Sequence, residues 1–85
     1  MITLSKPVKM VVVFTPGETP RPVKFKIKDN RGDEHTVYVD EILKVFDAVT
    51  NIRYYCATHY EDHVKRYELV YLKEKELWEV YRIVL

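Results

Sequence analysis

The chain has 85 residues, of which 47% are apolar and 32% charged, and its formal net charge is +1. This length and balance predict one folded domain over residues 1–85 and exclude a disordered or low-complexity chain. Because one cysteine cannot form an internal disulfide, we expect a reducing, cytoplasmic compartment. The longest apolar run, Met10 to Phe14, is too short for a signal-peptide core or a membrane span.

The first quarter of the chain contains one clear strand pattern. Residues 1–6 show no periodicity, so we expect a loose tail there. Val8 to Thr15 is predicted to be a strand, and its non-alternating apolar run is typical of a strand inside a sheet or covered on both faces. Thr15 to Pro22 contains three prolines and is predicted to be a loop.

A β-hairpin follows, and it gives the strongest fold signal in the sequence. Apolar residues alternate with lysines from Val23 to Lys28, which is the period of a strand with one buried face. Asp29 to Gly32 then fits a type I turn followed by a bulge, with Gly32 in the left-handed conformation. This turn predicts a register that places Phe25 opposite Val37 and buries Phe25.

A short helix is predicted near residues 41–49. Asp40 is a suitable N-cap residue, and Glu41 lies favourably at the positive end of a helix. The apolar residues of this segment follow at the helical spacing i, i+3, i+4 and i+7; they are Ile42, Val45, Phe46 and Val49.

The remainder of the chain is predicted to be β. Ile52 to Tyr60 forms a strand, and Lys65 to Leu72 pairs with Leu77 to Leu85 as a second hairpin. A two-residue loop in this hairpin places Tyr71 opposite Trp78. A three-residue loop places Leu72 opposite Trp78 and Glu68 opposite Arg82, and the turn sequence does not decide between the two loops.

Together these elements predict a mainly β (α+β) domain. Its six strands and one helix follow the order β-β-β-α-β-β-β. They form either an antiparallel sheet covered by the helix or a partly closed small barrel.

The charges are distributed unevenly along the chain. Residues 1–31 hold seven of the 14 basic residues but only two of the 13 acidic ones. The predicted hairpin register places a basic strand face beside one tyrosine; these candidate binding residues are Arg21, Lys24, Lys26, Lys28 and Tyr38. Such a face suits single-stranded nucleic acid, although alternating lysines also serve simply to solvate an outer face and discourage edge pairing.

A protein-interaction module is the first functional interpretation of the sequence. Seven Tyr, three Phe and one Trp exceed what so small a core can enclose, and surplus aromatics are typical of interfaces. We therefore expect association with another protein or with itself, through exposed aromatics or a sheet edge. The sequence carries no motif of a catalytic site, and we expect neither an enzyme nor a cofactor.

One group of residues has the chemistry of metal ligands. Cys56, His59 and His63 lie within eight residues, and His35 offers a fourth ligand for zinc. However, Cys56 and His59 point to opposite faces of a strand, and the tight knuckles of structural zinc sites are missing. Zinc is thus a remote alternative, and we expect no metal.

Four segments in order resemble a known family; they are Pro22 to Ile27, His35 to Leu43, Arg66 to Leu69, and Leu77 to Ile83. They are similar to a small uncharacterised bacterial domain with the motifs Pro-x-x-Phe-x-Trp, Tyr-x-Val, Tyr-x-Leu and Trp-x-x-x-Arg. Ile27 stands where that family usually has Trp. The resemblance implies a small β-rich bacterial domain that stands alone or near error-prone repair-polymerase accessory proteins, and it implies no established active site.

Overall fold

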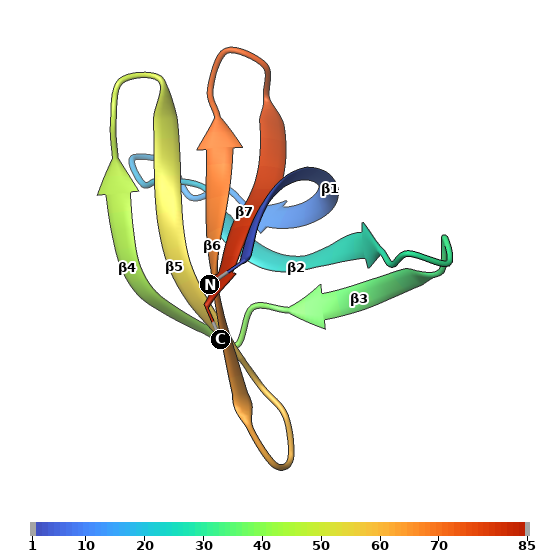
Figure 1. The fold of residues 1–85 in the computed structure, drawn as a ribbon. Helices are drawn as coiled ribbons and strands as arrows, with labels where there is room; N and C mark the ends of the chain where they lie inside the picture. Colours follow the sequence, from blue (N-terminus) through green and yellow to red (C-terminus); the bar gives the residue numbers. More distant parts are fainter. Residues whose placement is uncertain (1, 85) are drawn as a thin grey trace.

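The computed structural model describes residues 2–84 and forms one antiparallel sheet of seven strands (Figure 1). The strands are β1 (Ile2–Val13), β2 (Arg21–Lys28), β3 (Glu34–Tyr38), β4 (Glu41–Asp47), β5 (Asn51–His59), β6 (Val64–Leu72) and β7 (Leu77–Val84). The prediction of a mainly β, antiparallel domain is confirmed. The prediction of six strands and one helix is wrong, because residues 2–84 contain a seventh strand and no helix.

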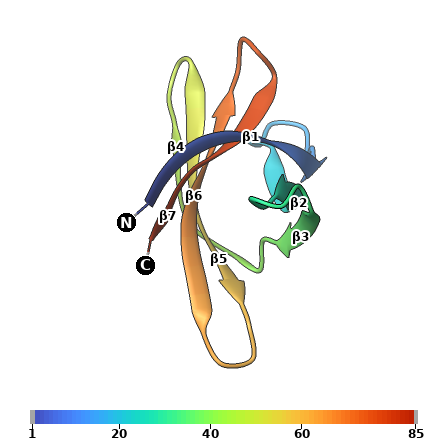
Figure 2. The same ribbon diagram turned by 45° about the vertical axis from the view of Figure 1, so that its right-hand side comes forward.

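The sheet consists of two meanders that are joined through the first and last strands. Its spatial order is β3-β2-β1-β7-β6-β5-β4, so β3 and β4 are neighbours in sequence but lie at opposite edges. Only Val39 and Asp40 connect them. A link of two residues reaches across only if the sheet curls until its two edges approach at one end. Figure 2 shows the resulting half-barrel.

Hydrogen bonds from both halves of the sheet hold the Val39–Asp40 link in place; we call this link the corner. The Val39 N–H donates to the Val23 carbonyl of β2, and the Asp40 N–H donates to the Ala57 carbonyl of β5. The Thr58 hydroxyl donates to the Tyr38 carbonyl at 2.6 Å and lies 2.8 Å from the Tyr67 hydroxyl. β3 and β4 do not pair with each other, so these hydrogen bonds are what connects the two edges of the half-barrel at this end.

The segment predicted as a helix near residues 41–49 is strand β4 and its turn. A bulge between Ile42 and Lys44 adds one residue to the strand, so Ile42 and Val45 both face the interior although three positions separate them. The bulge thus reproduces the helical i, i+3 spacing. Asp40 is not an N-cap; its carboxylate accepts the N–H of His59 at 2.7 Å.

The expected loose tail over residues 1–6 is also wrong where the structure describes it. Strand β1 begins at Ile2 and pairs with β7, with Ile2 opposite Ile83 and Val8 opposite Trp78. Because the two strands lie far apart in the sequence, no local turn predicts their pairing. The central position that the apolar run suggested for this strand is confirmed, because β1 lies between β2 and β7.

The predicted register of the first hairpin is confirmed. Phe25 lies opposite Val37 and Lys24 opposite Tyr38. Gly32 has a φ of 84°, and its N–H donates to the Asp29 carbonyl, as the turn chemistry predicts. The Asp29 carboxylate also accepts the N–H groups of Arg31 and Asp33.

In the second hairpin each alternative is found in part, since Leu72 lies opposite Leu77 and not opposite Trp78. Tyr71 lies opposite Trp78 near the turn, and a bulge between Glu68 and Leu69 shifts the register so that Glu68 lies opposite Arg82. Turn length alone could not predict this, because the bulge lies in the strand and not in the turn.

The core fills the concave side of the half-barrel. Its buried residues come from β2, β5, β6 and β7 and are Phe25, Ile52, Tyr54, Cys56, Tyr67, Leu69, Trp78 and Val80. The rings of Phe25 and Tyr67 meet edge to face at 5.7 Å between centroids. The Tyr54 hydroxyl donates to the Pro20 carbonyl, which fixes the proline-rich loop over this core. The predicted burial of Phe25 is thus confirmed.

A buried carboxylate pairs with a partly exposed arginine beside the shifted register of β6 and β7. The Glu68 side chain is fully buried, and its Oε2 lies 3.2 Å from Nε of Arg82, which is partly exposed. A buried carboxylate loses its hydration and depends on a nearby cation for compensation.

We predict that Thr58→Val destabilises the domain by about 1–3 kcal/mol, because the Tyr38 carbonyl and the buried Tyr67 hydroxyl both lose a partner without a change in volume. Urea unfolding will measure the loss. Thr36→Val, on the exposed β3, is the matched control and should change stability by less than about 0.5 kcal/mol. Equal midpoints for the two variants would show that the corner is not stabilised in this way.

We also predict that Arg82→Leu costs about 3–5 kcal/mol, since it leaves the carboxylate of Glu68 buried without its cation. The double variant Glu68→Leu/Arg82→Leu removes both charges and should recover most of that stability. Additive losses in a double-mutant cycle of urea unfolding would contradict the coupling.

Candidate functional site

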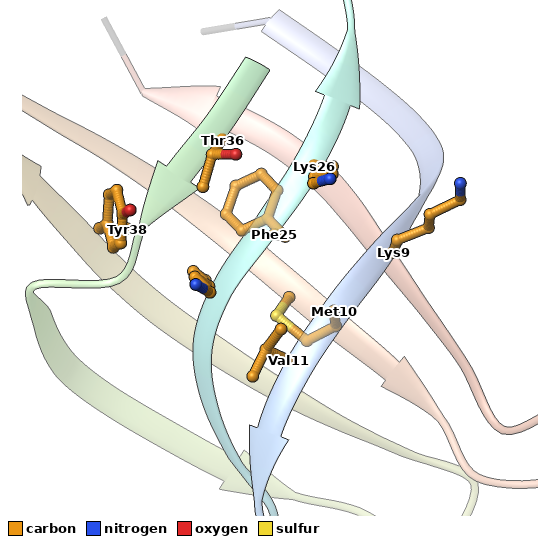
Figure 3. Close-up of a pocket in the computed structure, with 8 residues that line it drawn as sticks. Lys9, Met10, Val11, Phe25, Lys26, Thr36 and Tyr38 are labelled. Carbon is orange, nitrogen blue, oxygen red and sulfur yellow. The ribbon is translucent and has the colours of Figure 1, made fainter. Parts of the chain in front are cut away.

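A hollow lies on the outer face of the first meander, across β1, β2 and β3 (Figure 3). It has a volume of about 250 Å³. Its lining is Lys9, Met10, Val11, Lys24, Phe25, Lys26, Thr36 and Tyr38. Three strands thus contribute three lysines and one tyrosine to one concave surface.

The pairing of the three strands brings these side chains together. Lys26 lies opposite Lys9 on one side and opposite Thr36 on the other. Lys24 lies between Val11 and Tyr38 in the same way. Because directly opposed residues of paired strands point to the same face, two rows of three side chains cross the meander.

A second hollow of about 320 Å³ adjoins the first and shares Lys9 and Lys26 with it. Lys6 and Lys28 line it as well, and the ammonium group of Lys6 donates to the Lys28 carbonyl. We call the two hollows together the basic groove; its lysines are Lys6, Lys9, Lys24, Lys26 and Lys28.

The basic groove has little compensating negative charge. Among the described residues, no acidic side chain lines the first hollow, and Glu34 is the one acidic residue that lines the second. Within residues 2–84, no carboxylate forms an ion pair with Lys9, Lys24 or Lys26. Several like charges on a concave surface raise the local positive potential and attract anions.

Tyr38 gives the groove an aromatic wall. Its ring is half exposed, and the ammonium group of Lys24 lies 5.7 Å from the ring centroid. The backbone of Tyr38 is fixed from behind, since its carbonyl accepts the hydroxyl of Thr58. The ring is therefore exposed on a positioned backbone, which suits stacking on a planar ligand.

Most of the predicted basic face is found in this groove, with one exception. Lys24, Lys26, Lys28 and Tyr38 line it, but Arg21 does not. Arg21 lies opposite Val13, beyond the bulge in the β1–β2 pairing, and lines a separate hollow with Glu18.

Two lysines of the groove, Lys6 and Lys9, were not predicted from the sequence. Both belong to the first strand, whose contribution depends on its pairing with β2 and β7. The alternation of Lys9 with Val8 and Met10 was the available signal, since it places Lys9 on the face opposite the core.

The residues of the remote zinc alternative are not brought together. Cys56 is buried in the core, whereas His59 and His63 are exposed. Nε2 of His59 lies 2.6 Å from Glu41, and Nδ1 of His63 lies 2.6 Å from Asp62. No three His, Cys, Asp or Glu side chains between residues 2 and 84 form a cluster that could hold a metal ion.

Comparison of the chain with protein-family models, with curated proteins and with solved structures found no match. The similarity to the bacterial domain near repair-polymerase accessory proteins therefore stays a prediction. Among residues 2–84, no helix is long and apolar enough to cross a membrane.

Burial raises the pKa of the Cys56 thiol to about 12. The thiolate is the reactive form, so we predict that a maleimide or disulfide reagent modifies native Cys56 slowly at pH 8 and rapidly in denaturant. Mass spectrometry will follow the reaction. Equally fast labelling of native and unfolded protein would contradict the burial of this thiol.

Proposed function

We propose that the protein binds single-stranded nucleic acid in the basic groove. The observation that carries the proposal is the lining of the first hollow, where three lysines and one exposed tyrosine lie together and no acidic residue of the described chain takes part. Lysines supply contacts to phosphates, and an aromatic ring supplies a stacking surface for a base. These are the two features that single-strand binding surfaces combine.

The concave shape of the lysine face favours this function over simple solvation. Lysines that only solvate a strand project separately into water, whereas Lys9, Lys24 and Lys26 surround a common hollow. An exposed ring in that hollow can stack on an unpaired base. A duplex keeps its bases stacked inside, so it would contact the lysines without using Tyr38.

Association with another protein is the second candidate function. The exposed aromatics lie on different elements: Phe14 follows β1, Tyr38 lies in β3, Phe46 in β4 and Tyr60 after β5. Within residues 2–84 none of these four rings contacts another. They do not support one aromatic interface. The free edge of β4 supports strand pairing with a partner instead.

Either function makes the protein a non-catalytic binding module. We propose that it acts in the cytoplasm, which agrees with a single, buried thiol. Its placement near bacterial repair polymerases rests on the sequence resemblance alone. Single-stranded nucleic acid would be a fitting ligand for a protein in that setting.

A salt titration tests the nucleic-acid function. About three or four phosphate contacts give a slope of log affinity against log salt of about −2 to −3, so a fourfold increase in salt should weaken binding about 20- to 50-fold. Fluorescence anisotropy with a labelled oligothymidylate, compared with a duplex of equal length, will measure this. Absence of binding at low salt would overturn the proposal.

Two sets of variants locate the binding site. Lys9→Ala/Lys24→Ala/Lys26→Ala should keep the fold, because these side chains lie on the outer face, and should abolish most binding. Tyr38→Ala should weaken single-strand binding about tenfold, since stacking contributes about 1–3 kcal/mol per base. The matched controls, on other surfaces, are Lys65→Ala/Arg66→Ala/Lys75→Ala and Tyr60→Ala. Equal losses in test and control variants would place binding outside the groove.

A further inference from the structure

Within residues 2–84, strand β4 leaves one long edge of the sheet without a partner strand. It is the last strand in the spatial order, and its other side pairs with β5 (Figure 1). The opposite edge, β3, has only five residues. Of these two edges, β4 therefore has the greater capacity to pair with a further strand.

The hydrogen-bond pattern shows which backbone groups of β4 are free. The Ala48 N–H donates to the Asn51 carbonyl, so residue 48 bonds toward β5. Inward and outward backbone groups alternate along an antiparallel strand. Lys44 and Phe46 thus bond toward β5, and the N–H and carbonyl groups of Val45 and Asp47 point to the free edge.

Apolar side chains are exposed along the same edge. Val45 is 41% exposed, Phe46 46% and Leu43 50%. Phe46 and Lys44 lie on the outer face, where the ammonium group of Lys44 is 4.7 Å from the centroid of the Phe46 ring. A strand that pairs here would cover apolar surface as well as backbone groups, and both contribute to association.

From these features we propose that the β4 edge binds the β4 edge of a second copy of the chain, antiparallel, with Val45 opposite Val45 of that copy. The pairing does not rest on the nucleic-acid function, because the basic groove lies on another part of the sheet. For the second candidate function, association through a sheet edge, the partner is then a second copy of the chain.

The charges of β4 select this register. With Val45 at the centre, each Lys44 lies opposite Phe46 of the other copy, which gives two reciprocal cation–π contacts. With Lys44 at the centre, the two lysines face each other, so like charges are opposed. A centre at Phe46 pairs the two rings but places each Lys44 opposite Ala48, so the cation–π contacts between the copies are lost.

Pairing of identical edges also closes the assembly. A two-fold axis uses both β4 edges at once, so a third copy finds no β4 edge free. A single pair of strands buries less than a standard protein interface, which predicts a weak, reversible dimer. The bulge at residues 42–44 shortens the regular edge and limits pairing to its second half.

Sedimentation equilibrium over a range of concentrations tests the dimer. We expect a reversible monomer–dimer equilibrium for the wild type. Val45→Pro removes an N–H that points away from β5, so the fold should persist while the loss of one hydrogen bond per copy weakens association about tenfold or more. The groove variant Lys9→Ala/Lys24→Ala/Lys26→Ala is the control and should dimerise like the wild type. A wild type that stays monomeric would overturn the proposal.

Disulfide crosslinking tests the register with variants that do not disturb the backbone. Because the backbone groups of Val45 point to the free edge, the two Val45 residues form a hydrogen-bonded pair, whose Cα atoms lie about 5.5 Å apart. This spacing is within the range of a disulfide, so Val45→Cys should crosslink under mild oxidation. Phe46→Cys is the matched control, because this register places its two Cα atoms about 8 Å apart. The native Cys56 is buried and contributes no background. Faster crosslinking of Phe46→Cys would overturn the proposed register.

Nucleic-acid binding is measured separately with Val45→Pro, which leaves the groove intact. Retention of oligothymidylate binding by this monomeric variant shows that the two surfaces act independently. A monomeric wild type that still binds oligothymidylate would reject the β4 pairing alone, and a dimer that binds none would reject the groove function alone.

Discussion

The two-residue connection between β3 and β4 is the constraint on which the rest of this structure depends. These strands are adjacent in sequence and lie at opposite edges of a seven-stranded sheet. A flat sheet of that order would separate them by far more than two residues can span. The sheet therefore curls, its concave side encloses the core, and the buried hydroxyls of Thr58 and Tyr67 secure the corner.

The same corner relates the core to the candidate binding surface. Thr58 holds the carbonyl of Tyr38 from inside the half-barrel, while the ring of Tyr38 is exposed on the outside. Lys24 reaches that ring from the neighbouring strand. The aromatic side of the basic groove is thus positioned by hydrogen bonds that also stabilise the fold, so a change at Thr58 would affect both.

A barrel that is not fully closed has two edge strands, here β3 and β4, and these differ in length and in the side chains that they expose. The β3 edge is short and polar, and it lies beside the basic groove. The β4 edge carries exposed apolar side chains, a bulge and one lysine, and the last two are features that prevent unlimited strand addition. A closed dimer through β4 would use the apolar edge and leave the groove open to a ligand.

The sequence by itself determined the features that depend on neighbours in the chain. The Asp29–Gly32 turn and the alternation around Phe25 fixed the β2–β3 register, and with it the placement of Lys24 and Lys26 beside Tyr38. Local patterns suffice there because a tight turn sets the pairing of the strands that flank it.

Only the tertiary structure decided the features that depend on distant pairing or on bulges. The β1–β7 pairing joins strands from opposite ends of the described chain, and no local turn encodes it. Pairing with β7 and β2 brings Lys6 and Lys9 of β1 to the groove. A bulge separates Arg21 from that groove, and another gives β4 the spacing of a helix. Each bulge shifts the side-chain alternation by one residue, so a sequence pattern read with a fixed period assigns the wrong face or the wrong element.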